Sequence, residues 1–200
     1  MTWSDLQKLW SADAYRQTGV RSLRGVLKHL LVSDGDVSCS DGVKYTFYLR
    51  LCTYLHRAKP RWLVIIPYFL VHRLLLHYQY KFSVSISPHT SIGSGLYLGH
   101  VMNIVVSDRA VIGKNCNIGH GVTVGGVYRG ERIGTPVIGD NVYIGPGASV
   151  IGAIRVGNNV AIGTNCVVTR DVPDNAVVVG IPGRVVSFKG SAGYVNNTDY

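Results

Sequence analysis

The chain has 200 residues, of which 46% are hydrophobic, and it carries 24 glycines and a formal net charge of +9 at neutral pH. This length predicts one or two domains, and the composition predicts a folded core and excludes a low-complexity chain. The positive charge favours an anionic partner, which can be nucleic acid, a phospholipid surface or a phosphate-bearing substrate.

Cysteine spacing and the N-terminal sequence indicate the compartment. Cys39, Cys52, Cys116 and Cys166 form no CxxC motif and no tight cluster. The first residues lack a basic segment followed by an apolar run, so no signal peptide is expected. We therefore predict a cytoplasmic protein with reduced thiols.

The first 80 residues are predicted to form an α-helical N-terminal region, because their apolar residues are spaced by three and four. Longer helices are expected over residues 45–56 and 62–80, with a break at Pro60 and a polar loop over residues 33–42. The apolar run 62–71 is too short to span a bilayer. It either packs on the rest of the protein and a neighbouring subunit, which we favour, or lies on a membrane surface.

From Ile86 onward a branched aliphatic residue recurs at every sixth position. The series is Ile86, Ile92, Leu98 and Ile104, then after two extra residues Ile112, Ile118 and Val124, then after a longer break Ile138, Ile144, Val150, Val156, Ile162 and Val168. A period of six fits neither a helix nor an alternating strand, so each hexapeptide is expected to form one short strand and one corner. An antiparallel sandwich is the disfavoured alternative, because its strands and turns would be less regular.

Three such sides close a coil, and stacked coils bury the aliphatic column. The series predicts a mainly β fold: a parallel β-helix of about five coils over residues 81–188, followed by a polar tail over residues 189–200. Corners need residues that tolerate positive φ, and Gly113-Lys114-Asn115, Gly139-Asp140-Asn141 and Gly157-Asn158-Asn159 supply them at matching phases.

Five motifs carry a resemblance to a known family. They are Ser87-Pro88 before the first glycine pair, Gly95-Leu-Tyr-Leu-Gly-His100, His120-Gly-Val-Thr-Val-Gly-Gly126, Ile144-Gly-Pro-Gly147 and the closing segment from Asp171 to Arg184. Through these motifs, residues 84–186 resemble the hexapeptide-repeat, left-handed parallel β-helix acyltransferases, in their serine acetyltransferase-like branch. The resemblance implies a left-handed coil, a homotrimer, and acetyl-CoA bound in the groove between neighbouring β-helices.

The expected chemistry needs a general base, because an alcohol attacks a thioester slowly unless its proton is removed. His100 aligns with the catalytic histidine of the family and is the preferred base. His120 has the same phase in the next coil and is expected to line the cleft or to be the base itself. Asp108 stands where the family has a glutamate, and we expect it to orient a histidine. No metal is expected, because the two histidines lack the close histidine partner of a zinc site on this fold.

This chain also departs from the serine acetyltransferase pattern. Ser85 and Gly99 replace two aspartates of that family, and Gly134-Thr135 replace an Arg-His pair before a proline. The carboxylate clamp for a free amino acid is thus missing. We therefore expect O-acetylation of a sugar hydroxyl in a surface polysaccharide or its lipid-linked precursor, at the inner face of the membrane. Serine or another small acceptor, and a non-catalytic trimeric scaffold, are the alternatives.

The remaining site residues fall into two groups. The break after Val124 predicts a protruding loop whose Tyr128, Arg129 and Arg132 either contact the acceptor or make a trimer contact. The groove for acetyl-CoA is expected to involve Gly126, Gly145, Pro146, Gly163 and Thr164, with Arg170 and Arg184 either near its phosphates or on plain surface. Nucleic-acid binding is not expected, because no recognition motif accompanies the positive charge.

Overall fold

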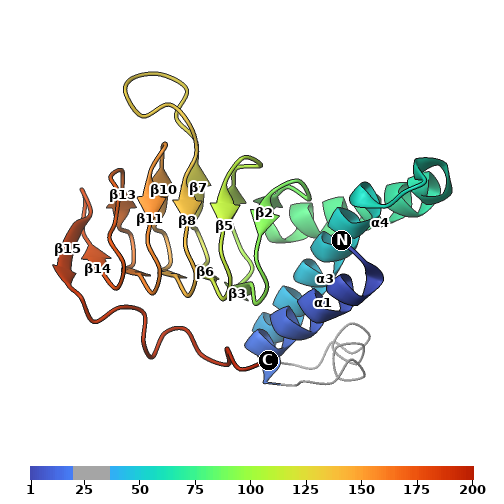
Figure 1. Ribbon diagram of the computed structural model, residues 1–200, viewed down its shortest axis with the longest axis horizontal. Helices are drawn as coiled ribbons and strands as arrows, with labels where there is room; N and C mark the ends of the chain where they lie inside the picture. The colour runs from blue at the N-terminus through green and yellow to red at the C-terminus, as the bar shows by residue number, and fades with distance from the viewer. Residues whose placement is uncertain (20–36) are drawn as a thin grey trace.

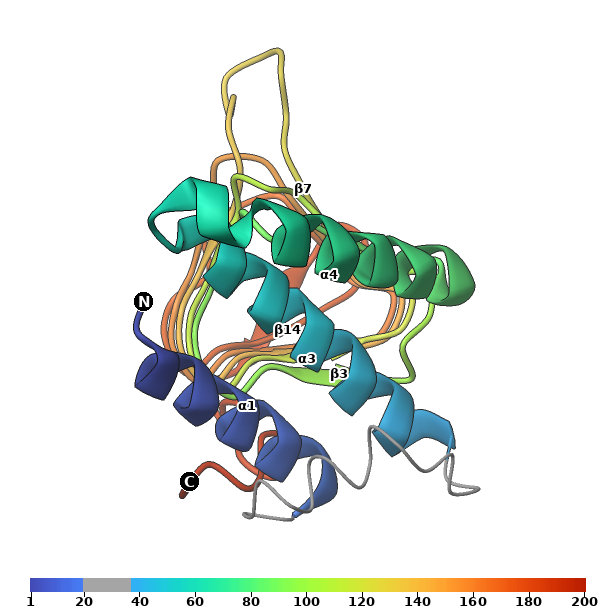
Figure 2. The same ribbon diagram turned by 90° about the vertical axis from the view of Figure 1, so that its right-hand side faces the viewer.

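The computed structural model describes residues 1–19 and 37–200. In it, a layer of helices packs on one end of a parallel β-helix (Figure 1). The described helices are α1 (Trp3–Thr18), α3 (Val37–Arg57) and α4 (Arg61–Phe82). α3 lies between α1 and α4, and α4 forms the outermost layer of that end (Figure 2). None of the described helices combines the length and the apolar character needed to cross a bilayer.

The predicted helices over residues 45–56 and 62–80 are present, but the predicted loop over residues 33–42 is wrong from residue 37 on, where α3 begins. Residues 33–36 lie outside the described part. Gly42, which suggested a loop, lies inside α3 where α1 crosses it. A Cβ at Gly42 would overlap the side chain of Gln17, so the close approach of the two helices requires glycine there.

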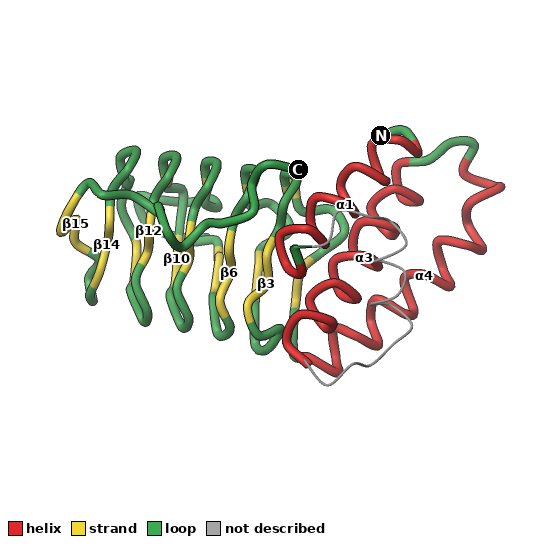
Figure 3. Tube along the Cα trace, turned by 90° about the horizontal axis from the view of Figure 1, so that it is seen from below, coloured by secondary structure: helices red, strands yellow, loops and turns green. Residues whose placement is uncertain are grey.

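Three parallel sheets form the sides of the β-helix, each taking one strand from successive coils (Figure 3). The first contains β1 (Ser85–Ile86), β4 (Val105–Val106), β7 (Thr123–Gly125), β10 (Ser149–Ile151) and β13 (Val167–Val168). The second contains β2 (Ser91–Ile92), β5 (Val111–Ile112), β8 (Val137–Ile138) and β11 (Arg155–Val156). The third contains β3 (Tyr97–Gly99), β6 (Asn117–Gly119), β9 (Tyr143–Ile144), β12 (Ala161–Ile162), β14 (Val177–Val179) and β15 (Arg184–Ser187), the last antiparallel to β14.

The aliphatic column predicted from the period is buried, with one correction. Val106, not Ile104, pairs with Ile86 on one side and Val124 on the other. Ile104 is also fully buried, but it occupies a second inward position, two residues before the column. The two extra residues therefore lie between Leu98 and Val106, in the corner that carries His100.

Asparagine side chains stack along the corner between the second and third sheets. Asn115, Asn141, Asn159 and Asn175 all have φ between 55° and 59°, and the sequence predicted this backbone for the corners of the first three. Each side-chain amide donates to the next asparagine oxygen, at 2.9, 3.0 and 3.2 Å in turn. Asparagine fits here because it tolerates the left-handed region and its amide both donates and accepts. We call this series the asparagine ladder.

The C-terminal tail runs back along the β-helix from the last coil to α1 (Figure 1). The backbone N–H groups of Gly190 and Ser191 donate to the carbonyls of Asn175 and Asn159, both at 2.9 Å. The Tyr194 ring stacks on Tyr143 at 4.6 Å between centroids. The polar tail predicted over residues 189–200 is therefore packed along the asparagine ladder.

Candidate active site

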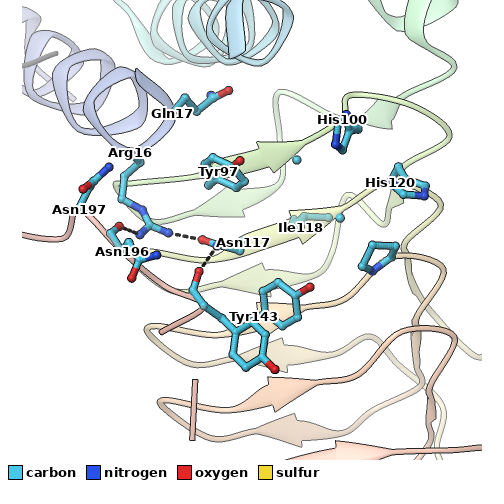
Figure 4. A pocket seen from close by; sticks show the side chains of 14 residues that line it. Arg16, Gln17, Tyr97, His100, Asn117, Ile118, His120, Tyr143, Asn196 and Asn197 are labelled. Atoms are coloured by element: carbon cyan, nitrogen blue, oxygen red, sulfur yellow. Dashed lines mark hydrogen bonds between the residues drawn. The ribbon is translucent and has the colours of Figure 1, made fainter. Parts of the chain in front are cut away.

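A groove of about 440 Å³ opens on the third sheet, between the corner of His100 and the helical layer. Figure 4 shows His100 and His120 at one end of this groove and Arg16 with Asn117 at the other. Tyr97 and Tyr143 form much of the floor between them, on strands β3 and β9. The walls come from three separate parts of the chain: α1, the β-helix and the C-terminal tail.

His100 lies in the corner that contains the two-residue insertion. Its φ is 52°, in the left-handed region, where a histidine is uncommon. This turn also holds Asn103 at a φ of 52°, whereas the corresponding turns of the next two coils place only one residue each in that region, Gly121 and Gly147. The insertion therefore gives the first coil its own corner geometry, with an exposed imidazole at the mouth of the groove. Such departures from preferred backbone geometry concentrate at functional sites.

His120 occupies the next coil directly beside His100. Both follow a glycine that ends a strand, and Gly99 pairs with Gly119 in the sheet register. The two imidazole rings meet edge to face with centroids 6.0 Å apart. The structure thus brings together the two histidines that sequence analysis singled out as the possible base.

The same corner continues through Pro146 and Thr164, so four residues predicted for the acetyl-CoA groove, Gly145, Pro146, Gly163 and Thr164, follow the histidines along one edge. A glycine precedes each residue of this edge, because the backbone of the next coil lies too close to the glycine position for a side chain there. A Cβ at Gly119 would lie 2.7 Å from the backbone nitrogen of Pro146, and one at Gly145 would lie 2.8 Å from the carbonyl oxygen of Ile162. This edge therefore presents small residues and backbone.

The opposite end of the groove is built by residues that sequence analysis missed. The Arg16 guanidinium donates to the carbonyls of Asn196 and Gly95 and to the side-chain oxygen of Asn117. Asn117 in turn donates to the Tyr194 carbonyl at 2.8 Å. Burial lowers the pKa of Arg16, although this guanidinium stays charged at neutral pH. Arg16 and its hydrogen-bond partners lie far apart along the chain, so no local sequence motif predicts their contact.

Asp108 is not brought to His100 within one chain. It is exposed on the corner between β4 and β5, whereas His100 lies on the corner between β3 and β4. Tyr128 is also exposed, on the loop that leaves β7 and protrudes from the β-helix (Figure 1). Arg129 and Arg132 lie on that loop, and Gly126 stands at its base beside Thr135. Within one chain this group is remote from the groove.

Arg170 and Arg184 meet at the far end of the β-helix, where both line a small cavity of about 100 Å³. This end lies several coils from His100. In the residues that the structure describes, no three His, Cys, Asp or Glu side chains gather closely enough to hold a metal ion. The described cysteines Cys52, Cys116 and Cys166 are buried and free.

Comparisons with known proteins agree with this architecture. Residues 135–170 match the family described as bacterial transferase hexapeptide (six repeats). The chain is 38% identical over 154 residues to the serine acetyltransferase of Synechococcus elongatus, covering 76% of this chain and 59% of that protein. It is 39% identical over 123 residues to the serine acetyltransferase of Bacillus pumilus, covering 62% of this chain and 57% of that protein. The chain thus spans little more than half the length of these curated relatives.

Solved structures give a wider match. The serine acetyltransferase of Neisseria gonorrhoeae in complex with serine superposes with a TM-score of 0.66 and 32% identity, covering 92% of this chain and 70% of that chain. The enzyme of Brucella abortus in complex with coenzyme A superposes with a TM-score of 0.68 and 27% identity, covering 92% and 68%. The hexapeptide β-helix, its helical cap and these matches together show that the chain belongs to the serine acetyltransferase family of hexapeptide-repeat acyltransferases.

Proposed function

We propose that this protein is an acetyl-CoA-dependent O-acetyltransferase in which His100 acts as the general base. The observation that carries the proposal is the pair of imidazoles, His100 and His120, side by side at the mouth of one groove. A neutral imidazole accepts a proton near physiological pH, which a hydroxyl acceptor requires. A purely structural scaffold would have no need for two histidines at this position.

In the proposed reaction, one ring nitrogen of His100 takes the proton of the acceptor hydroxyl as its oxygen attacks the thioester carbonyl carbon. The carbon–sulfur bond then breaks, and the imidazolium returns the proton to the departing thiolate. Acetyl ester and free thiol are the products, so charge and protons balance. His120 is placed to hold the acceptor or to replace His100 as base. A base of this kind contributes about 10²- to 10⁴-fold in rate.

The donor is proposed to bind along the edge that continues from the histidines. Gly145, Pro146, Gly163 and Thr164 present backbone and small side chains there, which allows a flexible pantetheine chain to lie close. Arg170 and Arg184 form a cationic end further along, suited to phosphate groups. The relative from Brucella abortus carries coenzyme A, which supports this donor.

L-Serine is the acceptor that the comparisons support, because the curated relatives are serine acetyltransferases and the related structure from Neisseria gonorrhoeae holds serine. Acetylation of serine yields O-acetylserine, so this function would place the protein in cysteine biosynthesis. We propose that this reaction takes place in the cytoplasm.

A sugar hydroxyl is the second candidate acceptor, and one observation favours it. Among the described residues that line the groove, none is an aspartate or glutamate. The positions Ser85 and Gly99 carry no carboxylate to hold the ammonium group of an amino acid. Asparagine amides and tyrosine rings line the groove instead, and these groups suit the hydroxyls and ring faces of a glycan.

A homotrimer is proposed as the functional assembly. Asp108, Tyr128, Arg129 and Arg132 are remote from the groove of their own chain, and a neighbouring β-helix is what would bring such residues to an acceptor. The protruding loop from Val127 to Gly134, closed by paired backbone hydrogen bonds of 2.9 Å between its two ends, is a defined hairpin suited to that contact.

The direct test measures release of coenzyme A from acetyl-CoA with purified protein, offering L-serine and, separately, a panel of bacterial oligosaccharides. Serine-dependent release abolished by His100→Ala would support serine acetylation, whereas glycan-dependent release abolished by the same change would support the second candidate. Release that survives His100→Ala but not His120→Ala would move the base to His120. No release with any acceptor would contradict the proposal.

A further inference from the structure

Helix α4 carries apolar side chains on both of its faces, and only one face is covered. Leu75 and Phe82 are buried in the hydrophobic core on the side of α4 that packs on α3, and Tyr68, Val71 and Tyr78 pack against the same core. The opposite side keeps eight large side chains exposed by 45% to 82%, namely Trp62, Leu63, Ile65, Ile66, Phe69, Leu70, Leu74 and Tyr80. We call this surface the α4 outer face. A helix that is apolar all round normally has a partner on each side.

The α4 outer face lies at the extreme end of the molecule. Figures 2 and 3 show α4 as the last layer beyond α3, with nothing described outside it. The sequence alone favoured packing of this apolar run against the rest of the protein and a neighbouring subunit. In the described part of the chain the α4 outer face stays exposed, so it either has an occupant from outside the chain or remains an unusually large exposed patch.

Charge distinguishes the possible occupants. No aspartate or glutamate occurs between Asp41 and Asp108, whereas this stretch contains seven Lys and Arg residues. Arg57, Lys59 and Arg61 are exposed next to Trp62 at the start of α4. An apolar helical face bordered by cations and a tryptophan is the surface that binds the headgroup region of an anionic bilayer.

Arg73 places a positive charge within the α4 outer face. It is exposed and lies in helical register between Phe69, Leu70 and Leu74, so it belongs to the α4 outer face itself. On a membrane its long stem lies along the apolar surface while the guanidinium reaches a phosphate. In a symmetric contact between two copies of this face, Arg73 would be desolvated close to the cations of the other copy, with no carboxylate from this stretch to pair with.

We propose that the α4 outer face binds the surface of an anionic phospholipid membrane, with the helix lying parallel to the bilayer plane. The end of α4 is also tied to the catalytic corner, because the Asn103 N–H donates to the Phe82 carbonyl at 3.2 Å. Membrane binding therefore holds the histidines near the lipid surface. This inference stands on the helix alone and does not depend on which acceptor the site uses.

The test is co-sedimentation of the full-length protein with vesicles of phosphatidylglycerol and phosphatidylcholine, compared with vesicles of phosphatidylcholine alone. Binding is expected to the anionic vesicles, to weaken in high salt, and to fall at least about tenfold in Phe69→Asp. Phe188→Asp is the matched control, because Phe69 and Phe188 are exposed to similar extents, 62% and 65%, at opposite ends of the molecule. The control is expected to bind as the native protein does.

Two further measurements keep the outcome decisive. Circular dichroism establishes that each variant is folded, and Lys59→Gln combined with Arg61→Gln tests the cations without touching the apolar face; this pair is expected to weaken binding to anionic vesicles. Equal binding by Phe69→Asp and Phe188→Asp, or no binding of native protein to anionic vesicles, overturns the proposal. If vesicles fail to bind and Phe69→Asp lowers the mass measured by light scattering, the face is instead an interface between copies.

Discussion

His100 and His120 lie edge to face across two adjacent coils, with ring centroids 6.0 Å apart, although twenty positions separate them in sequence. The separation equals one coil enlarged by the two-residue insertion after Leu98. Because the coils are in register, any pair of residues at the same phase meets in this way. The two imidazoles are therefore neighbours because the repeat places both histidines at the same phase of adjacent coils.

Replacing His100 by alanine is expected to reduce kcat by about 10²- to 10⁴-fold while the protein stays folded, because the change removes the proposed base from an exposed position. The measurement is release of coenzyme A with the best acceptor, together with a thermal melt. His120→Ala serves as comparison and is expected mainly to raise KM. A larger loss of kcat in His120→Ala than in His100→Ala would reverse the assignment.

The buried pair of Asp13 and Arg50 connects α1 to α3, and Asp13 also accepts from the Leu96 N–H at 2.8 Å. Burial raises the pKa of Asp13, and the Arg50 guanidinium opposes that rise. Arg50→Met removes the opposing charge and leaves a buried carboxyl unpaired, which is expected to cost about 3 to 5 kcal/mol when the carboxyl is ionised.

The pH dependence of that variant follows from the sign of the shift. A folded-state pKa above the unfolded value means that the folded protein holds the proton more tightly, so stability falls as pH rises from the unfolded pKa through the folded one. Arg50→Met should therefore lose more stability relative to native protein at pH 8 than at pH 5, in urea unfolding at both values. An equal loss at the two pH values would contradict this account.

Asn159 sits in the middle of the asparagine ladder with φ of 55°, accepting from Asn141 and donating to Asn175. Asn159→Ala is expected to cost more than Asn159→Gly, because alanine loses the ladder and also resists the left-handed backbone, which glycine adopts freely. A difference of about 1 kcal/mol between the two variants is expected in chemical unfolding. Equal losses would mean that the hydrogen bonds alone matter.

Arg16 fastens the C-terminal tail, because it donates to the Asn196 carbonyl and to Asn117, which holds the Tyr194 carbonyl. Arg16→Met is expected to release residues 194–200, seen as faster amide hydrogen exchange there while amides of the coils stay protected. Tyr200→Phe, which removes only the hydroxyl contacts with Ser94 and Asn115, should release less of the tail. An unchanged exchange pattern in Arg16→Met would refute the fastening role.

Gly145→Ala should destabilise the protein by about 1 to 3 kcal/mol, because the new methyl group meets backbone atoms of the next coil that cannot move aside. Gly125→Ala is the matched control. Its methyl group would approach the end of the Ile151 side chain at 3.1 Å, which can rotate away. Thermal melting should separate the two variants, and equal melting temperatures would show that the coils yield more than this geometry suggests.

Local periodicity predicted the β-helix and the pairing of the histidines, because both depend only on the repeat. It misplaced the insertion, since Ile104 and Val106 are both aliphatic and both point inward, and a period alone does not choose between them. It also missed the inward position two residues before the column, where smaller residues such as Ala148 and Cys166 are buried.

Contacts between distant segments were beyond such reasoning. The groove wall formed by Arg16 and Tyr194 joins α1 to the tail, and no spacing in the sequence relates them. The same limit explains Asp108, which was assigned beside a histidine by resemblance and lies on another corner of its own chain. Gly42 misled the helix prediction, because its role depends on Gln17 from a different helix.

The antiparallel strand β15 has a consequence for assembly. A stack of parallel coils ends in an open edge of hydrogen-bonding groups, onto which another molecule's first coil could add without limit. Here β15 pairs with β14 in the opposite direction. The segment between these two strands also bonds to Val167 of β13: the Gly180 carbonyl accepts from the Val167 N–H, and the Gly183 N–H donates to the Val167 carbonyl. With helices covering the other end, neither end of the stack presents the parallel edge that would favour end-to-end growth into fibrils.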